Sequence, residues 1–321
     1  MLVCASTRVA MGDLQVNAES AGLSPQHVPP PTQVRASPSL STRLARIGRA
    51  LRSGIFFVIY FCYLTLIMGL GQRVLLWPAM VLLPRRRRAM VRAWLRFHAI
   101  ATVRMARVFA GVRLTTTGSL PAESCIVVMN HQSVLDIPLG LSLVTGPYPL
   151  IPTRDRYRRG IPGISPLSRL ARFPFLSQGR TLSRAELASL TDAATQVARG
   201  EQSLLIFPEG HRTDDGRIGR FMRNGLRITL ARASRPVYCV VADGMSHART
   251  FADAFLRFAG THIRVVVLGP YPPPSDDTHV DAFIDMLHQR MTAELDAMRA
   301  ARGPSPGDAP PSPSVPSARA D

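Results

Sequence analysis

The sequence predicts an α/β fold, a mostly parallel sheet flanked by helices, behind an N-terminal membrane-embedded helix or helical hairpin. Two patterns carry this prediction. Short apolar runs rich in β-branched residues alternate with helical patterns from residue 112 onward, as in a parallel sheet covered on both faces. Before them, residues 54–72 contain no charged residue.

The uncharged stretch 54–72 would be roughly 28 Å long as a helix, close to the ~30 Å hydrocarbon core of a bilayer. A second apolar run, 74–84, is too short to span alone. Arg residues lie both before and after this apolar region, so the positive-inside rule leaves two membrane arrangements open. One is a single span. The other is a hairpin or shallow helix pair with both ends cytoplasmic and its Arg residues on lipid headgroups. A buried core helix is the third possibility.

The remaining segments divide the chain into four predicted parts. Residues 1–42 and 303–321 are rich in Ser, Pro and Ala and should form disordered tails. Residues 43–110 hold the membrane-anchoring helix and an amphipathic stretch, 89–110. That stretch either lies on an anionic membrane surface or packs on the domain with a solvated Arg face. Residues 111–302 form the α/β domain.

The order of elements within that domain follows from local patterns. The predicted strands are 124–129, 148–151, 173–177, 203–207, 237–242 and 263–269. The clearest helices are 184–199 and 280–301. The first of these opens with a capping box, Ser183 and Glu186, and closes at Gly200.

Composition narrows the partners. The net charge is +18 and the pI is near 11.4, which favours anionic partners. The Arg residues are interleaved with Leu, Phe and Val beside the apolar stretch, and no nucleic-acid motif is visible. An anionic membrane surface is therefore favoured over nucleic acid. The four Cys residues are scattered, without the spacing of a zinc site or a disulfide framework.

Two polar segments, 130–136 and 207–213, each follow a predicted strand, where open α/β sheets bind ligands. In the first, Asn130 can cap a helix. Asp136 can hold the Nδ1–H of His131 and leave Nε2 free as a general base. Five residues of regular helix would place these two side chains about 140° apart, so His131 has to precede the helix. An ordinary structural hydrogen bond is the alternative.

In the second segment, Gly210 allows close approach of the backbone to a ligand. Arg212 offers a planar fork for phosphate. Glu209 could hydrogen-bond a hydroxyl or hold Arg212 in place. The alternative is a turn stabilised by a Glu–Arg ion pair.

Together, Asn130-His131-Gln132-Ser133 with Asp136 and Phe207-Pro208-Glu209-Gly210-His211-Arg212 resemble the two signature blocks of the glycerolipid acyltransferases. This family includes the bacterial 1-acyl-glycerol-3-phosphate acyltransferases, and the resemblance covers roughly residues 110–270. It implies that residues 111–302 form an acyltransferase domain in which His131 is the general base and Asp136 its orienting partner.

The resemblance also implies that Glu209, Gly210 and Arg212 bind the phosphorylated acceptor. A third block, 173–180, ends at Arg180 and implies another contact with the acceptor phosphate. A fourth, 236–240, lacks its second Pro. The chain departs from the family at His211, commonly Thr, and at Gly179, commonly acidic. Both positions are expected near the acceptor pocket, so the departures bear on the identity of the acceptor more than on the type of reaction.

The implied reaction is attack of an acceptor hydroxyl on an acyl thioester, with acyl-CoA or acyl-carrier protein as co-substrate and no cofactor or metal. Backbone N–H groups near the first block are expected to hold the oxyanion. The implied acceptor is a lysophospholipid, 1-acyl-glycerol-3-phosphate, giving phosphatidic acid. The implied place is the cytoplasmic membrane, with the domain facing the cytoplasm. Two alternatives stay open: another acceptor, such as a different lysophospholipid or lyso-ornithine lipid, and a non-catalytic lipid-binding membrane protein.

Overall fold

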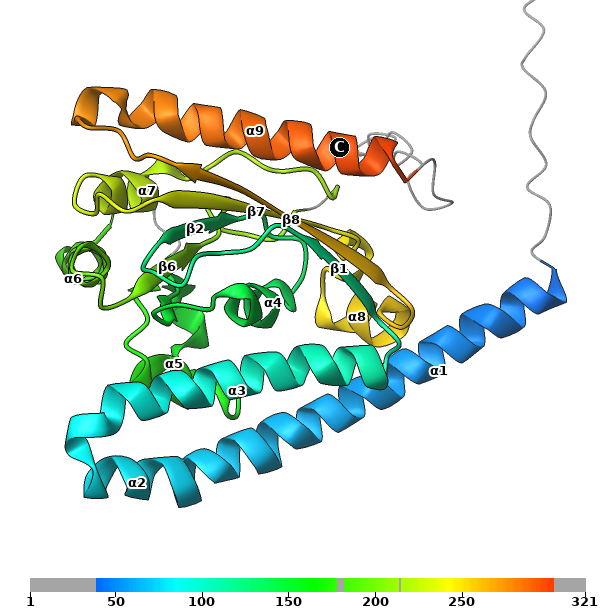
Figure 1. Cartoon of the computed structure of the whole chain (residues 1–321). Coiled ribbons are helices and arrows are strands. Elements are labelled where there is room, and N and C mark those ends of the chain that lie inside the picture. The colour runs from blue at the N-terminus through cyan, green and yellow to red at the C-terminus, as the bar shows by residue number, and fades with distance from the viewer. Residues whose placement is uncertain (1–38, 178–181, 214, 303–321) are drawn as a thin grey trace, which may run out of the picture. The chain divides into compact units, whose positions relative to one another are not determined.

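The computed structural model describes residues 39–177, 182–213 and 215–302. A six-stranded sheet has the order β1-β8-β7-β2-β6-β3 (Figure 1). Its strands are β1 (Arg113–Thr117), β2 (Ile126–Met129), β3 (Pro149–Leu150), β6 (Ser203–Ile206), β7 (Val237–Asp243) and β8 (His262–Tyr271). Each neighbouring pair is parallel except β7 and β8, which run antiparallel. The predicted, mostly parallel sheet is confirmed.

A second, small sheet pairs β4 (Thr153–Arg154) with β5 (Phe175–Leu176). Each of the six predicted apolar runs overlaps a strand, whereas β1 and β4 were not predicted. The sequence of β1 is polar and mostly exposed, because this edge strand bonds only to β8 and buries little. A periodicity argument has no apolar signal to detect there.

Helices cover both faces of the sheet. One face carries α6 (Arg184–Ala198), α7 (Arg223–Leu230) and α9 (Val280–Ala300), and the other carries α4 (Asp136–Leu143) (Figure 1). Shorter elements complete the domain: α5 (Ile164–Leu170), α8 (Phe251–Arg257), η4 (Asp155–Arg158), η5 (Ser246–Ala248) and η6 (Asp277–His279). The capping box predicted at Ser183 and Glu186 is present at the start of α6.

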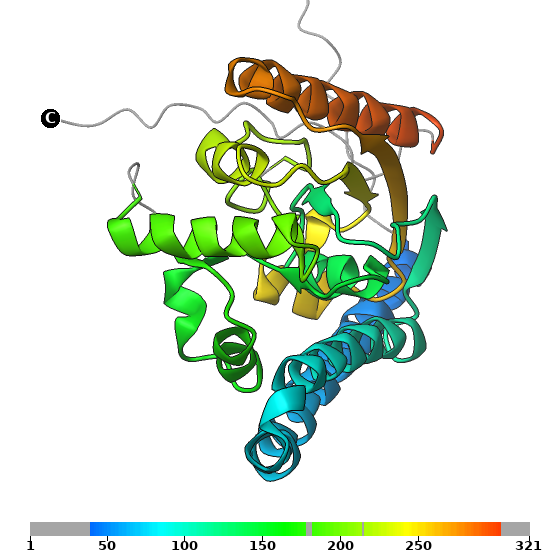
Figure 2. The same cartoon turned by 60° about the vertical axis from the view of Figure 1, so that its left-hand side comes forward.

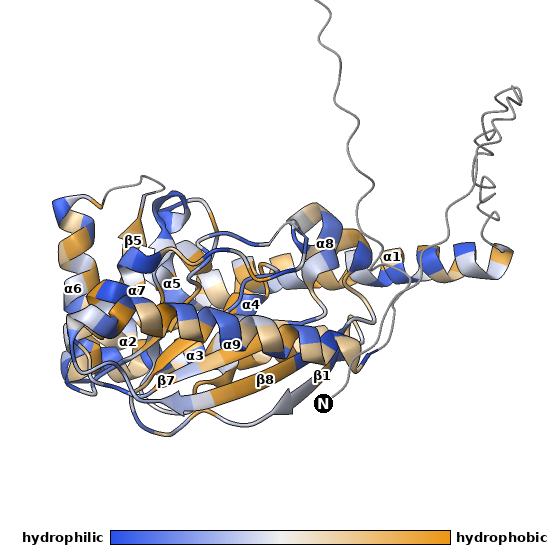
Figure 3. Cartoon of the chain, turned by 90° about the horizontal axis from the view of Figure 1, so that it is seen from above, coloured by the Kyte–Doolittle hydropathy of each residue, from blue (hydrophilic) through white to orange (hydrophobic). Residues whose placement is uncertain are grey.

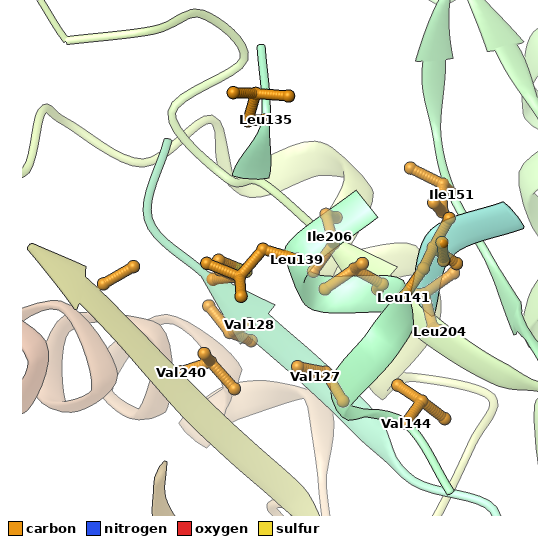
Figure 4. Close-up of a cluster of buried hydrophobic side chains, with 14 of the residues drawn as sticks. Val127, Val128, Leu135, Leu139, Leu141, Val144, Ile151, Leu204, Ile206 and Val240 are labelled. Atoms are coloured by element: carbon orange, nitrogen blue, oxygen red, sulfur yellow. The ribbon is translucent and has the colours of Figure 1, made fainter. Parts of the chain in front are cut away.

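The helices are amphipathic in the way this layering requires. On α9 the buried residues recur every three or four positions: Val280, Ile284, Leu287, Met291, Leu295 and Met298. Hydrophilic and hydrophobic residues alternate along this helix in Figure 3. In the core, Val127 and Val128 of β2 and Ile206 of β6 lie beside Leu139 of α4 (Figure 4). The strand ends that carry the two polar segments are thereby fixed against one another.

The N-terminal helices form one long run and a return. The run consists of α1 (Leu40–Cys62), the π-helical segments η1 (Tyr63–Leu70) and η2 (Gln72–Leu76), and α2 (Trp77–Leu82). The chain turns at η3 (Pro84–Arg86), and α3 (Arg87–Val108) returns beside the run in both Figure 1 and Figure 2. By length and composition, Leu40–Leu82 is long and apolar enough to cross a membrane.

This run packs against the α/β domain near both ends of its apolar stretch. The Ser53 hydroxyl accepts a hydrogen bond from the Ala259 N–H at 2.7 Å. At the other end, the Gln72 amide donates to the Gly163 carbonyl at 2.7 Å. Between them, Phe57 is fully buried. The opposite side of the run exposes large apolar residues, among them Ile55, Val58, Phe61, Leu66, Ile67, Leu70, Val74 and Leu75.

Helix α3 packs on the domain through Val91, Leu95, His98, Ala99, Thr102 and Ala106. The Arg residues of this amphipathic stretch lie on its exposed side. One of them, Arg96, donates to the Thr145 carbonyl at 2.9 Å. Of the two interpretations of 89–110, packing on the domain therefore describes the contacts of this helix.

Candidate active site

His131 and Asp136 meet at the carboxyl end of β2. The distance from His131 Nδ1 to Asp136 Oδ2 is 2.8 Å. Helix α4 begins at Asp136, so His131 lies before it, as the spacing required. The Asp136 side chain is 0% exposed, and the same Oδ2 accepts from the backbone N–H groups of Gln132 and Ser133. This carboxylate therefore fixes the imidazole so that Nε2 is the ring nitrogen left for chemistry.

The side chains beside His131 are bonded to backbone groups of distant segments. Asn130 both donates to the carbonyl and accepts from the N–H of Ala242, on β7. Its predicted role as a helix N-cap is wrong, because Leu135 is the N-cap residue of α4. Ser133 donates to the Ala248 carbonyl at 2.9 Å. These side chains hold in place the loop that presents His131.

Glu209 connects the two predicted segments. Its Oε1 accepts from the His131 N–H and its Oε2 from the Gly219 N–H, both at 2.8 Å. The Thr213 N–H donates to the His131 carbonyl at 2.8 Å, so both backbone groups of His131 are used. Glu209 is 1% exposed. Burial raises its pKa, and the two backbone hydrogen bonds oppose that rise. No hydrogen bond described joins Glu209 to Arg212.

Gly210 adopts a left-handed backbone with φ of 68°, and a Cβ atom there would lie 2.5 Å from Met222 Sδ. Its carbonyl accepts two hydrogen bonds from the guanidinium of Arg154, at 3.1 and 2.6 Å. Sequence reasoning missed Arg154. The only available signal was its place after the apolar run 148–151, one of several such positions in an Arg-rich chain.

Arg212 lies beside Arg154 and stays partly exposed. One of its guanidinium nitrogens donates to the Arg249 carbonyl at 2.5 Å. Burial, helped by the like charges of Arg156 and Arg212, lowers the pKa of Arg154. Two mutually repelling guanidinium groups next to a candidate base form a local attraction for an anion.

Comparison with known protein families agrees with the site geometry described above. A family model described as "Acyltransferase" matches residues 111–243, which include both polar segments and β7. These residues form an acyltransferase-family domain. The resemblance to the glycerolipid acyltransferases is confirmed.

The human 1-acyl-sn-glycerol-3-phosphate acyltransferase beta is 26% identical over 171 residues, 53% of this chain and 59% of that protein. The human alpha protein is 26% identical over 165 residues, 50% of this chain and 56% of its own. The matched region thus spans a little over half the length of these relatives. The crystal structure of the 1-acyl-sn-glycerophosphate (LPA) acyltransferase PlsC from Thermotoga maritima aligns with a TM-score of 0.58 and 22% identity. That alignment covers 79% of this chain and 98% of PlsC, and it shows a shared fold.

An apolar cavity of about 170 Å³ opens at His131 in this acyltransferase domain. Arg212 and Thr153 line it beside His131. The remaining wall comes from α3, α4, α5, the long N-terminal run and the loop residues next to these helices. Its apolar members include Leu64, Met68, Leu95, Leu135, Leu141, Ile164, Leu167 and Phe173. The sequence had predicted a need for such a space without locating it.

Two further expectations have different outcomes. Arg180 and Gly179 lie outside the described residues. Backbone N–H groups of His131, Gln132 and Ser133 cannot hold an oxyanion as expected, because Glu209 and Asp136 already accept from them. Within the described ranges, no three His, Cys, Asp or Glu side chains could together hold a metal ion.

Proposed function

We propose that the chain transfers a fatty acyl group from acyl-CoA or acyl-carrier protein to the hydroxyl of a lysophospholipid. The proposed acceptor is 1-acyl-glycerol-3-phosphate, which gives phosphatidic acid. The observation that carries this proposal is the His131–Asp136 pair at the opening of an apolar cavity, with Arg212 in the same wall. The printed names of the two human relatives and of the Thermotoga protein support the acceptor.

In the proposed reaction, His131 Nε2 takes the proton of the acceptor hydroxyl as that oxygen attacks the thioester carbonyl. A C–O bond forms, the C–S bond breaks, and His131 returns the proton to the leaving thiolate. Asp136 holds the ring and stabilises its protonated form. The reaction needs no cofactor beyond the acyl thioester and no acyl-enzyme, because the acceptor oxygen is itself the nucleophile.

The acceptor phosphate is proposed to bind Arg212, with Arg154 next to it. Burial and, after it, the like charges of Arg156 and Arg212 lower the pKa of Arg154, and a phosphate beside Arg154 and Arg212 would offset that repulsion. Gly210 positions Arg154 near Arg212, because the Gly210 carbonyl, two residues before Arg212, accepts hydrogen bonds from the Arg154 guanidinium. Glu209 acts in this proposal as a positioning residue, since it is 1% exposed and bridges two backbone segments.

The fatty chain is proposed to occupy the apolar cavity, and the long N-terminal run to lie within one leaflet of the cytoplasmic membrane. Ser53 and Gln72 both hydrogen-bond to the domain, although about 28 Å of helix separates them. A helix crossing the bilayer could not keep both contacts with one water-exposed domain. The exposed apolar side of the run would then face lipid, and the Arg residues at both ends would meet anionic headgroups on the cytoplasmic side.

The test is acyl transfer from oleoyl-CoA to lysophosphatidic acid by purified wild type and two variants. His131→Ala should lose about a hundredfold or more of kcat, because the general base is gone. Arg212→Ala should mainly raise the acceptor KM, by about tenfold. Matched controls are His262→Ala and Arg217→Ala, which remove the same side-chain types at exposed positions. Near-normal turnover of the His131 variant, with its fold intact, would refute the proposal.

A second candidate keeps the chemistry and changes the acceptor. The observation that favours it is His211, exposed beside Arg212, where the resembling family commonly has Thr. Transfer to lysolipids that lack a phosphomonoester, including lyso-ornithine lipid, would support this candidate. A protein inert towards every donor and acceptor would instead support the non-catalytic, lipid-binding alternative.

A further inference from the structure

A groove distinct from the cavity at His131 lies between the N-terminal run and the segment 159–170, which includes α5. The volume of this groove is about 830 Å³. The Gln72 amide connects its two walls by donating to the Gly163 carbonyl at 2.7 Å. Ile161 lines both the groove and the cavity, so the groove lies directly beside the proposed substrate site.

Three arginine side chains line the groove: Arg73 on the run, and Arg159 and Arg169 on the other wall. All three residues are exposed, so a ligand in the groove can reach them, and no acidic residue lines it. Within the described ranges, none of the three forms an ion pair with a carboxylate. Arg169 donates one N–H to the Arg158 carbonyl at 2.9 Å and keeps its others. Asp155 lines a neighbouring hollow with Arg159, but its carboxylate pairs with Arg158 at 2.8 Å.

The other polar residues of the groove do not oppose an anion. The Ser165 hydroxyl is used within the protein, since it donates to the Tyr157 carbonyl at 2.9 Å and accepts from the Ile161 N–H at 3.1 Å. The Gln72 Oε1 atom is an acceptor without a partner, but it is buried, so a ligand in the groove does not meet it. Thr65 is exposed, and its hydroxyl can donate. The groove therefore presents positive charge and no negative charge.

Arg73 is a cation within the part of the run that would face lipid in the proposed placement. Its neighbours Leu70, Val74 and Leu75 are all exposed. A charged side chain at such a position is costly unless an opposite charge or water accompanies it. Trp77, four residues further on, lines the same groove and is 61% exposed. Trp is enriched at the level of the lipid headgroups, so this part of the groove is suited to a headgroup.

We propose that the groove binds the headgroup phosphate of an anionic membrane phospholipid. The inference rests on the proposed function, since it takes the run to lie in one leaflet. Phosphate oxygens accept from several guanidinium groups at once, so one headgroup would bridge Arg73 on the run and the two arginines on the domain. A zwitterionic headgroup would bring its own cation into an already positive groove, which favours the anionic lipid. The bound lipid would thereby fasten the run to the domain beside the substrate cavity.

The test uses the fluorescence of Trp77, which bromine atoms on a lipid chain quench on contact. The chain contains only two Trp residues, so Trp94→Phe leaves Trp77 as the reporter. Full-length protein in neutral detergent micelles is titrated with brominated phosphatidylglycerol or brominated phosphatidylcholine. Half-maximal quenching should require about tenfold less of the anionic lipid. The same titration of protein that keeps Trp94 checks that this substitution does not change the preference.

Substitutions separate a defined site from diffuse surface charge. Arg73→Gln and Arg159→Gln should each reduce the preference for the anionic lipid about threefold, and the double variant should bring the ratio to about one. The matched control is Arg43→Gln, which removes the same charge from an exposed position of the same run outside the groove. It should leave the ratio unchanged. Equal losses in Arg43→Gln and Arg73→Gln would show that diffuse charge attracts the lipid, and would overturn the inference.

Two further results would overturn the inference while leaving the proposed acyl transfer in place. One is equal half-maximal amounts of the two lipids. The other is displacement of the anionic lipid by free coenzyme A, which would assign the groove to the phosphates of the acyl donor. Quenching by neither lipid is a different result. It would refute the proposed membrane placement of the run, and this inference with it, whereas the turnover of His131→Ala tests the reaction separately.

Discussion

The geometry around His131 depends on single residues that bond to backbone rather than to substrate. The polar neighbours of His131 fix its loop to segments that are distant in the sequence, and Glu209 fixes its N–H. The buried Glu209 carboxylate accepts hydrogen bonds from two backbone N–H groups, those of His131 and Gly219. It thus takes the place that water would have as their hydrogen-bond partner. A substitution at one of these neighbouring residues is therefore expected to displace the His131 imidazole, without changing its chemistry directly.

Gly210→Ala tests this coupling between backbone and site. A Cβ atom would be strained at φ of 68° and would lie 2.5 Å from Sδ of the exposed Met222, so this side chain must move while the backbone strain stays in the turn. The expected loss in the free energy of unfolding is about 1–3 kcal/mol, with a raised acceptor KM because the Gly210 carbonyl holds Arg154. Denaturant unfolding and steady-state kinetics measure the two effects.

The matched control for that variant is Gly160→Ala. Gly160 also has a positive φ, of 96°, but a Cβ there would meet nothing within 4 Å. The control therefore carries backbone strain without a clash. Equal destabilisation of the two variants, with no change in acceptor KM, would show that the contact with Met222 is unimportant.

The residues that could be predicted from the sequence are those whose partner is near in the chain. His131 and Asp136 are separated by four residues, and their pairing followed from that spacing and the strand before it. The partners of Asn130 and Glu209 could not be read this way. The Ala242 backbone is 112 residues from Asn130, and only the assembled sheet brings the two together.

The same distinction holds for the elements. The central strands and α6 were predictable because buried apolar runs and a local capping box specify them. The edge strand β1 was not, since its pairing with β8 depends on tertiary contact. The N-terminal run shows a third case. Its composition fits both a span and a packed helix, and only the contacts of its two sides separate these roles.

Two Phe residues four positions apart in α1 allow those sides to be tested separately. Phe57 is 0% exposed and packs on Phe258, with ring centroids 5.9 Å apart, whereas Phe61 is 46% exposed. Phe57→Ala should lower the free energy of unfolding by about 3–5 kcal/mol, because it opens a cavity in the core. Phe61→Ala should change stability by less than about 1 kcal/mol but weaken binding to anionic vesicles. Unfolding and vesicle co-sedimentation measure the pair, and the reverse pattern would contradict the assignment of the two sides.

At the scale of the whole molecule, the placement of the N-terminal run decides how a fatty chain reaches His131. The cavity wall includes Leu64 and Met68 from this run, so the base lies next to a segment that would be embedded in lipid. If the run lies in one leaflet, a lysolipid can enter sideways from the membrane without its chain crossing water. A run that crossed the bilayer would have to separate from the domain and would leave the cavity without that wall.

Single-cysteine labelling on sealed, oriented vesicles tests this placement. The variants Arg46→Cys and Arg86→Cys, exposed positions before and after the apolar stretch, are made in a Cys4→Ser, Cys62→Ser background. The remaining thiols, Cys125 and Cys239, are buried. A membrane-impermeant maleimide added from the side that carries the domain should label both positions to the same extent, because both ends of the run face that side. Labelling at only one position would establish a single span, provided that detergent makes both reactive. In that event the hydrogen bonds of Ser53 and Gln72 to the domain could not both persist in the membrane.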